Sequence, residues 1–119
     1  MRTHLVTAAA VTAVLALVAP VHAKDRTGYK AIAAQDYAKA ERRLDAERRI
    51  FPNKPELLLN LAAVYLKTGR PAEARALYAE VLDQPATMMD LASGRSVSSH
   101  AVAATAVAAL DRGTAVAAR

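Results

Sequence analysis

The sequence matches itself at a spacing of 34 residues, and this match restricts the fold more than any other feature. The repeated positions pair Gly28 with Ala62, Ala38 with Ala72, Ala40 with Ala74 and Leu44 with Tyr78. A helical hairpin that recurs at this interval cannot bury its apolar face alone, so it stacks on the next hairpin. The repeat therefore predicts stacked antiparallel helical hairpins, an architecture that usually presents a concave surface to another protein.

The first 23 residues have the pattern of a signal peptide. A short basic start precedes the uncharged apolar run Leu5–Ala19, and small residues lead up to Ala23. As a helix, this run would be about 22 Å long, shorter than the roughly 30 Å hydrocarbon core of a bilayer. We therefore expect cleavage after Ala23, export to the periplasm or the medium, and no stable membrane insertion afterwards. The alternative is an uncleaved membrane anchor.

The remaining chain, residues 24–119, is long enough for one small domain. It contains no cysteine, so neither disulfides nor a lipid-bearing amino-terminal cysteine can contribute. Without residues 1–23, whose only formally charged side chain is Arg2, the net charge falls from +5 to +4. This mild basicity suits an anionic surface or partner. Export and the scarcity of aromatic residues argue against nucleic acid.

The first repeat is predicted to contain a short helix and a long charged one. Residues 24–34 form the short helix, and Asp36 is positioned to cap the helix Tyr37–Ile50. The apolar residues of the long helix recur every third or fourth position. Its arginine pairs, 42–43 and 48–49, either form a basic patch for an anionic partner or belong to a solvated outer face. The mixed signs of charge along the helix favour the second interpretation.

The second repeat has clearer boundaries. Asn53 and Glu56 resemble a capping arrangement, and Pro55 suits a first helical turn. Residues 57–66 are apolar almost all round, so this helix must be covered on several sides. Gly69 is expected to end it in a left-handed conformation, and Pro71 to begin the next helix.

Beyond Pro85 the repeat loses its register. Residues 86–97 are expected to form a loop with one extended stretch, in which Met88 and Met89 either offer a pliable contact or fold onto the core. Ser98 or Ser99 can cap a final helix over residues 98–112, with a flexible tail at 113–119. This helix would cover the open side of the second hairpin, as terminal repeats must.

These features resemble the tetratricopeptide repeat family. The residues that carry the resemblance are Leu61, Ala62, Tyr65, Gly69, Ala74, Tyr78 and Pro85. The match is good over residues 53–85 and partial over 24–52, where Gln35 occupies the position of the turn glycine and Ala31 that of the usual tyrosine. The resemblance implies an all-α fold in which residues 24–85 form two stacked antiparallel helical hairpins, followed by a C-terminal capping helix.

The resemblance also implies a binding surface. Inner helices of such repeats line the concave side, which would direct Leu59, Asn60, Ala63 and Lys67 toward a groove for a protein or peptide. Asn60 occupies the position at which some family members grip a peptide backbone. The companion positions hold Asp25 and Tyr29, so a generic groove is favoured over such a clamp.

The sequence contains no recognisable catalytic constellation. His100 is the only histidine after Ala23 and has no cysteine beside it, so we expect no metal site. Ser98, Ser99, His100, Asp90 and Asp111 could be drawn as a hydrolytic triad. However, adjacent Ser and His point in different directions at the start of a helix. The four glycines are isolated, so no phosphate-binding loop is expected.

We therefore predict a non-enzymatic exported adaptor without a cofactor, accessory to envelope assembly or secretion. The alternative is a structural module that completes its short stack by forming a homo-dimer or larger homo-oligomer.

Overall fold

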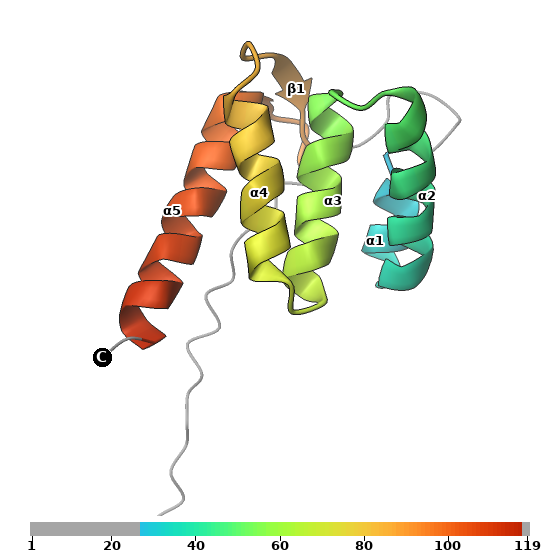
Figure 1. Ribbon diagram of the computed structural model, residues 1–119. Helices are drawn as coiled ribbons and strands as arrows, with labels where there is room; N and C mark the ends of the chain where they lie inside the picture. Colours follow the sequence, from blue (N-terminus) through green and yellow to red (C-terminus); the bar gives the residue numbers. More distant parts are fainter. Residues whose placement is uncertain (1–26, 118–119) are drawn as a thin grey trace, which may run out of the picture.

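The computed structural model describes residues 27–117, which form a row of helices with a small β-hairpin at one end (Figure 1). The elements are α1 (Tyr29–Ala33), α2 (Tyr37–Ile50), α3 (Pro55–Lys67), α4 (Pro71–Leu82), β1 (Met88–Asp90), β2 (Ser96–Ser98) and α5 (Ser99–Ala117). The mostly helical stack was predicted from the sequence, and the two-stranded sheet is an addition to it. The predicted signal peptide lies outside the described residues.

Helices α1 and α2 form the first hairpin, α3 and α4 the second, and α5 packs against α4 (Figure 1). Helix α3 lies in the middle, and every side chain from Leu57 to Val64 is buried. Its burial on all sides explains why its sequence has no polar face. Ala40, Ala62 and Ala74 are completely inaccessible to solvent, because small side chains stand where the helices approach most closely.

Most of the predicted helix ends are confirmed. The Asp36 carboxylate accepts a hydrogen bond from the backbone N–H of Lys39 at 3.2 Å. Gly69 has φ 74°, the left-handed conformation that ends α3, and Gln35 has φ 59° at the same position of the first repeat. Pro55 and Pro71 begin α3 and α4. The capping role predicted for Asn53 is wrong: Lys54 is the N-cap of α3, without a side-chain hydrogen bond.

Three boundaries differ from those expected. Helix α1 has only five residues, because Gly28 before it adopts φ 69°. Residues predicted as a loop pair instead in an antiparallel hairpin, with Met88 opposite Ser98, Met89 opposite Val97 and Asp90 opposite Ser96. Helix α5 continues to Ala117, because Gly113 is not in the left-handed conformation that would end it.

Candidate partner-binding face

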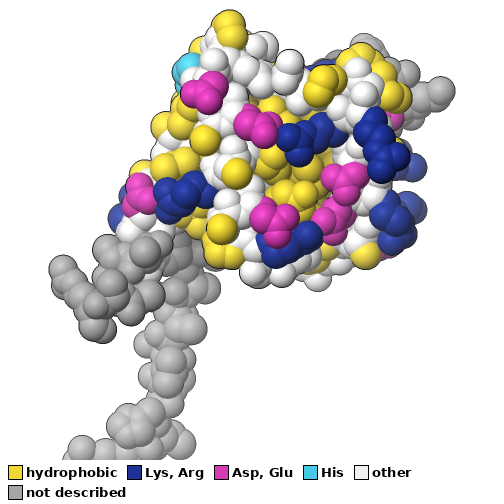
Figure 2. All heavy atoms as spheres, in the orientation of Figure 1, with side chains coloured by type: hydrophobic (Ala, Val, Ile, Leu, Met, Phe, Trp, Pro, Cys, Tyr) yellow, Lys and Arg dark blue, Asp and Glu magenta, His cyan; other side chains and the backbone are white. Residues whose placement is uncertain are grey.

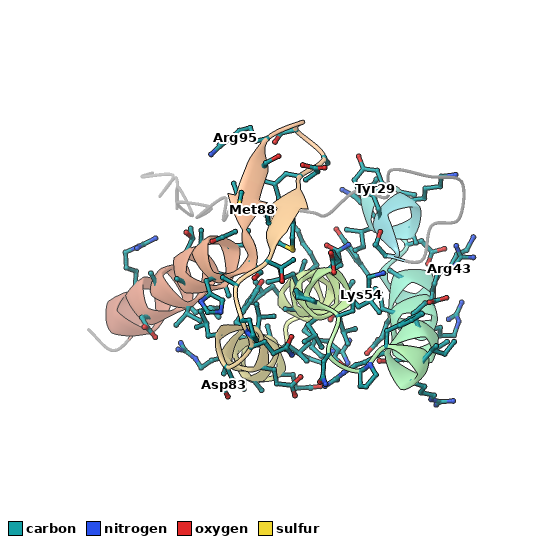
Figure 3. All side chains as sticks on the ribbon, turned by 90° about the horizontal axis from the view of Figure 1, so that it is seen from above. Tyr29, Arg43, Lys54, Asp83, Met88 and Arg95 are labelled. Atoms are coloured by element: carbon teal, nitrogen blue, oxygen red, sulfur yellow. The ribbon has the colours of Figure 1, made fainter. Side chains whose placement is uncertain are left out.

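Helices α1, α3 and α5 lie toward one side of the stack, which we call the inner face (Figure 3). The β1–β2 hairpin lies on this side, over the beginning of α3 and between α1 and α5 (Figures 1 and 3). Met89 of β1 is only 4% exposed and packs into the same hydrophobic cluster as Leu59 of α3. The hairpin therefore extends the core across the inner face.

The four residues predicted to line a groove have different environments. Leu59, Asn60 and Ala63 are at most 2% exposed, whereas Lys67 at the end of α3 is exposed. The three buried residues do not form an open groove in this conformation. Other parts of the protein cover the side of α3 that the sequence was expected to leave open to a partner. Of the four, only Lys67 is accessible to a partner.

The side chain of Asn60 binds a backbone group of its own chain rather than the backbone of a bound peptide. Its side-chain amide donates a hydrogen bond of 2.9 Å to the carbonyl oxygen of Thr27. Both residues are buried, so this bond is shielded from water. It joins the segment before α1 to the middle of α3, 33 residues later in the sequence.

The base of the hairpin is held by residues at the start of α5. The Ser99 N–H donates to the carbonyl of Thr87 at 2.8 Å, and the Ser99 hydroxyl accepts from the Thr87 N–H at 2.9 Å. His100 donates from Nε2 to the carbonyl of Gln84 at 2.6 Å. Ser98 caps α5 by accepting from the N–H of Ala101. Ser99 and His100 thus bond to different backbone groups, and their contacts do not form the nucleophile–base pair that a hydrolytic triad requires.

The opposite, outer side of the stack is bridged by ion pairs. Arg48 of α2 donates two hydrogen bonds to the Glu80 carboxylate of α4, at 2.9 and 3.1 Å. Nη1 of Arg70, the residue just before α4, lies 2.7 Å from Oε1 of Glu41 in α2. The Arg70 guanidinium also stacks over the ring of Tyr65, with its central carbon 4.4 Å from the ring centroid. Both ion pairs connect the outer helices of consecutive hairpins across α3.

The charges of these pairs alter the acidity of their neighbours. The hydrogen bond from Arg70 lowers the pKa of Glu41, and its positive charge adds to this effect. Desolvation raises the pKa of Asp45, and the nearby negative charge of Glu41 raises it further. Burial raises the pKa of Tyr78 to about 12, so this core tyrosine is neutral at physiological pH.

Between residues 27 and 117, no group of three or more histidine, cysteine, aspartate or glutamate side chains could hold a metal ion. Within the same part of the chain, no helix combines the length and the apolar character needed to cross a bilayer.

Sequence reasoning did not find the backbone partner of Asn60, and it anticipated that the methionines at 88 and 89 fold onto the core without telling which of them does so. Thr27 contributes a backbone carbonyl, for which the sequence contains no signal. Met89 could be recognised only as one of two adjacent methionines, of which the structure buries one and leaves the other, Met88, 66% exposed. Alternation of that kind is the mark of a strand with one covered face.

Comparison with known proteins identifies the family of the repeat. Residues 31–87 match a model of the tetratricopeptide repeat, a segment that covers α2, α3 and α4 and most of α1. No curated protein and no solved structure shows a significant match to the chain.

Proposed function

Because residues 31–87 make this a tetratricopeptide-like protein, we propose that it is a non-enzymatic adaptor that binds a protein partner through its inner face. Tetratricopeptide repeats are protein-interaction modules, and members of this class are typically not enzymes. Recognition here would use apolar contact along α3, as peptide-binding helical grooves do.

One observation carries this proposal: Leu59 on the inner side of α3 shares its hydrophobic cluster with the β1–β2 hairpin, whose strands contribute a single buried side chain. Each strand of the hairpin has three residues, and Met89 is the only one of the six strand residues that is buried. An isolated two-stranded hairpin is marginally stable in water. A partner segment that presents an apolar side chain in place of Met89 would displace the hairpin and contact Leu59 and Ala63, with Lys67 at the edge of the site.

We place the protein outside the cytoplasm, in the periplasm or the medium, as an accessory to envelope assembly or secretion. The support is the amino-acid pattern of residues 1–23, with its basic start, apolar run and small residues before Ala23. Sequencing the amino terminus of the protein recovered from the envelope fraction tests this assignment. Lys24 as the first residue is expected, and an intact Met1 in the cytoplasm would contradict it.

The binding face is tested by photo-crosslinking in the native host. A photoreactive residue replaces Lys67 in one full-length variant and the exposed Ala79 of the outer helix α4 in another. We expect a discrete protein adduct from position 67 and none from position 79. Adding Met89→Ser should increase the yield from position 67, because the hairpin is released more readily. Equal yields from both positions would refute the inner face, and an unchanged yield with Met89→Ser would refute displacement of the hairpin.

A second candidate function is self-association through α5. The exposed residues in the first half of this helix, Ala101, Ala104, Thr105 and Ala108, recur at the spacing of one helical face and carry no charge, and the charged Asp111 and Arg112 continue that face toward its end. A further helix of a longer stack would pack on this surface, and a second copy of the chain could do so here. Sedimentation equilibrium decides between the two functions. A mass that doubles with concentration and reverts with Ala104→Glu supports the dimer, whereas a monomer at all concentrations eliminates it.

A further inference from the structure

The outer surface of α2 is a continuous cationic face. Its exposed cations are Lys39, Arg42, Arg43 and Arg49, which fall at intervals of three, four or seven residues together with Ala46 and Ile50. Residues at this spacing share one side of a helix. Figure 3 shows Arg43 on the side of α2 that is remote from α3, directed away from the stack. We call these six residues the cationic face.

Three acidic residues of α2 border this face. Glu41 turns toward α4, where it pairs with Arg70. Asp45 senses the charges of Glu41 and Arg70 and also those of Arg48 and Arg49, and Glu47 follows Arg43 by one helical turn. The remaining cation, Arg48, also turns toward α4 and pairs with Glu80. Figure 2 shows dark blue side chains along the edge formed by α2 and magenta ones toward the middle of the stack. Positive charge therefore predominates on the cationic face, with four exposed cations on it and Asp45 and Glu47 at its borders. This excess favours the basic patch over a neutral solvated face.

One end of the cationic face is apolar. Ile50 is 67% exposed, and the adjacent Phe51 is 39% exposed. The ammonium group of Lys54 lies 5.3 Å from the centre of the Phe51 ring, so another cation borders these apolar side chains. Ile50 is the last residue of α2 and Phe51 is its C-cap, and no helix between residues 27 and 117 buries either side chain.

We propose that the cationic face of α2, with Ile50 and Phe51 at its end, docks the protein on the surface of an anionic lipid bilayer. A bilayer presents negative headgroups over a wide plane and apolar chains just beneath them, and these two properties match the two parts of the surface. An acidic protein segment would match the cations but would leave Ile50 and Phe51 without an apolar partner. This proposal does not depend on partner binding at the inner face, because the inner face and the cationic face lie on different sides of α2.

The test is co-sedimentation of the full chain with vesicles of phosphatidylcholine alone or of phosphatidylcholine mixed with phosphatidylglycerol, at low and high salt. The ratio of the two affinities isolates the effect of lipid charge, because any contribution of residues 1–23 is common to both vesicles. Each Lys or Arg near an anionic surface strengthens binding by a factor of about five. We therefore expect Arg42→Glu/Arg49→Glu to weaken binding to the anionic vesicles by at least roughly 25-fold, and high salt to weaken binding of the wild type.

A matched control changes the net charge equally at a distance from α2. Arg95 in the hairpin turn and Arg112 near the end of α5 are both exposed, so Arg95→Glu/Arg112→Glu should bind almost as the wild type does. Ile50→Ser/Phe51→Ser should weaken binding severalfold without altering its dependence on salt. Circular dichroism verifies that each variant is folded.

Three outcomes would overturn the proposal. Equal losses in the two arginine pairs would show that only net charge matters. Full binding by Ile50→Ser/Phe51→Ser would show that the apolar end does not reach the bilayer. Binding to soluble polyglutamate but not to the anionic vesicles would assign the cationic face to an acidic protein instead.

Discussion

The side chain of Asn60 holds the carbonyl of Thr27 at 2.9 Å inside the protein, joining two segments 33 residues apart. This bond fixes the start of the first repeat against the inner helix of the second. Helix α1 has only five residues, of which Ala31 and Ile32 are buried. Asn60, expected from the family resemblance to face a bound peptide, thus connects two parts of the stack instead.

Replacing Asn60 with alanine should destabilise the protein by about 1–3 kcal/mol, because a buried carbonyl loses a hydrogen-bond donor. Urea unfolding followed by circular dichroism measures the change. Lys67→Ala, on the exposed end of the same helix, is the control and should alter the free energy of unfolding by less than about 0.5 kcal/mol. Equal effects of the two substitutions would mean that the Asn60 hydrogen bond contributes nothing.

Gln35→Gly should stabilise the protein by roughly 0.5–1 kcal/mol. Gln35 is held at φ 59°, a left-handed conformation that costs an L-residue about 1–2 kcal/mol, part of which is offset by the greater freedom of glycine in the unfolded chain. The matched control is Gly69→Ala, 34 residues later at φ 74° with open space around it, which should destabilise the protein by about 1 kcal/mol. Thermal unfolding of both variants should therefore shift the midpoint in opposite directions.

The parts of the fold that follow from repetition could be predicted from the sequence. Small residues are required where helices cross closely, so the alanines at 40, 62 and 74 marked the contacts that the structure places in the core. The turn after α3 was predictable for a similar reason, because Gly69 tolerates the left-handed conformation that the turn requires.

The candidate site was less accessible to sequence reasoning, because it depends on a segment that breaks the repeat. Residues 86–98 contain no long alternation, and only the tertiary contact of Met89 reveals which side of the hairpin is covered. Without that contact, Leu59 and Ala63 were expected at an open surface. Gly113 was also misleading: a lone glycine near a helix end suggests a stop, yet α5 continues beyond it to Ala117.

Met89→Ala and Met88→Ala form a pair of neighbouring substitutions that tests how the hairpin is attached. Met89 is 4% exposed and Met88 66%, so the first removes packed apolar atoms and the second removes atoms already in water. We expect a loss of about 2 kcal/mol or more for Met89→Ala and less than about 0.5 kcal/mol for Met88→Ala. Hydrogen exchange of the hairpin amides should accelerate only in the first variant. Acceleration in both would mean that Met89 does not anchor the hairpin.

The pair between Glu41 and Arg70 should make stability depend on pH in the acid range. Arg70 lowers the pKa of Glu41 in the folded protein below its ordinary value of 4.5. The ion pair therefore stabilises the fold above about pH 4.5 and loses its effect as the pH falls through the lowered pKa. Both side chains are about one third exposed, so Glu41→Gln should cost only a few tenths to about 1 kcal/mol at neutral pH, and less in high salt.

Asp45, one helical turn further along α2, should behave in the opposite way. Desolvation and the charge of Glu41 raise its pKa above the ordinary value of 3.8, so its ionised form opposes folding. The stability that the protonated Asp45 side chain adds to the folded protein is complete below pH 3.8, and it is lost as the pH rises through the raised pKa. Asp45→Asn should therefore stabilise the protein at neutral pH but not at pH 3, whereas Glu41→Gln should destabilise it at neutral pH and much less at pH 3. Urea unfolding of both variants across this range measures the two curves, and curves that shift in the same direction would contradict the opposite environments of the two carboxylates.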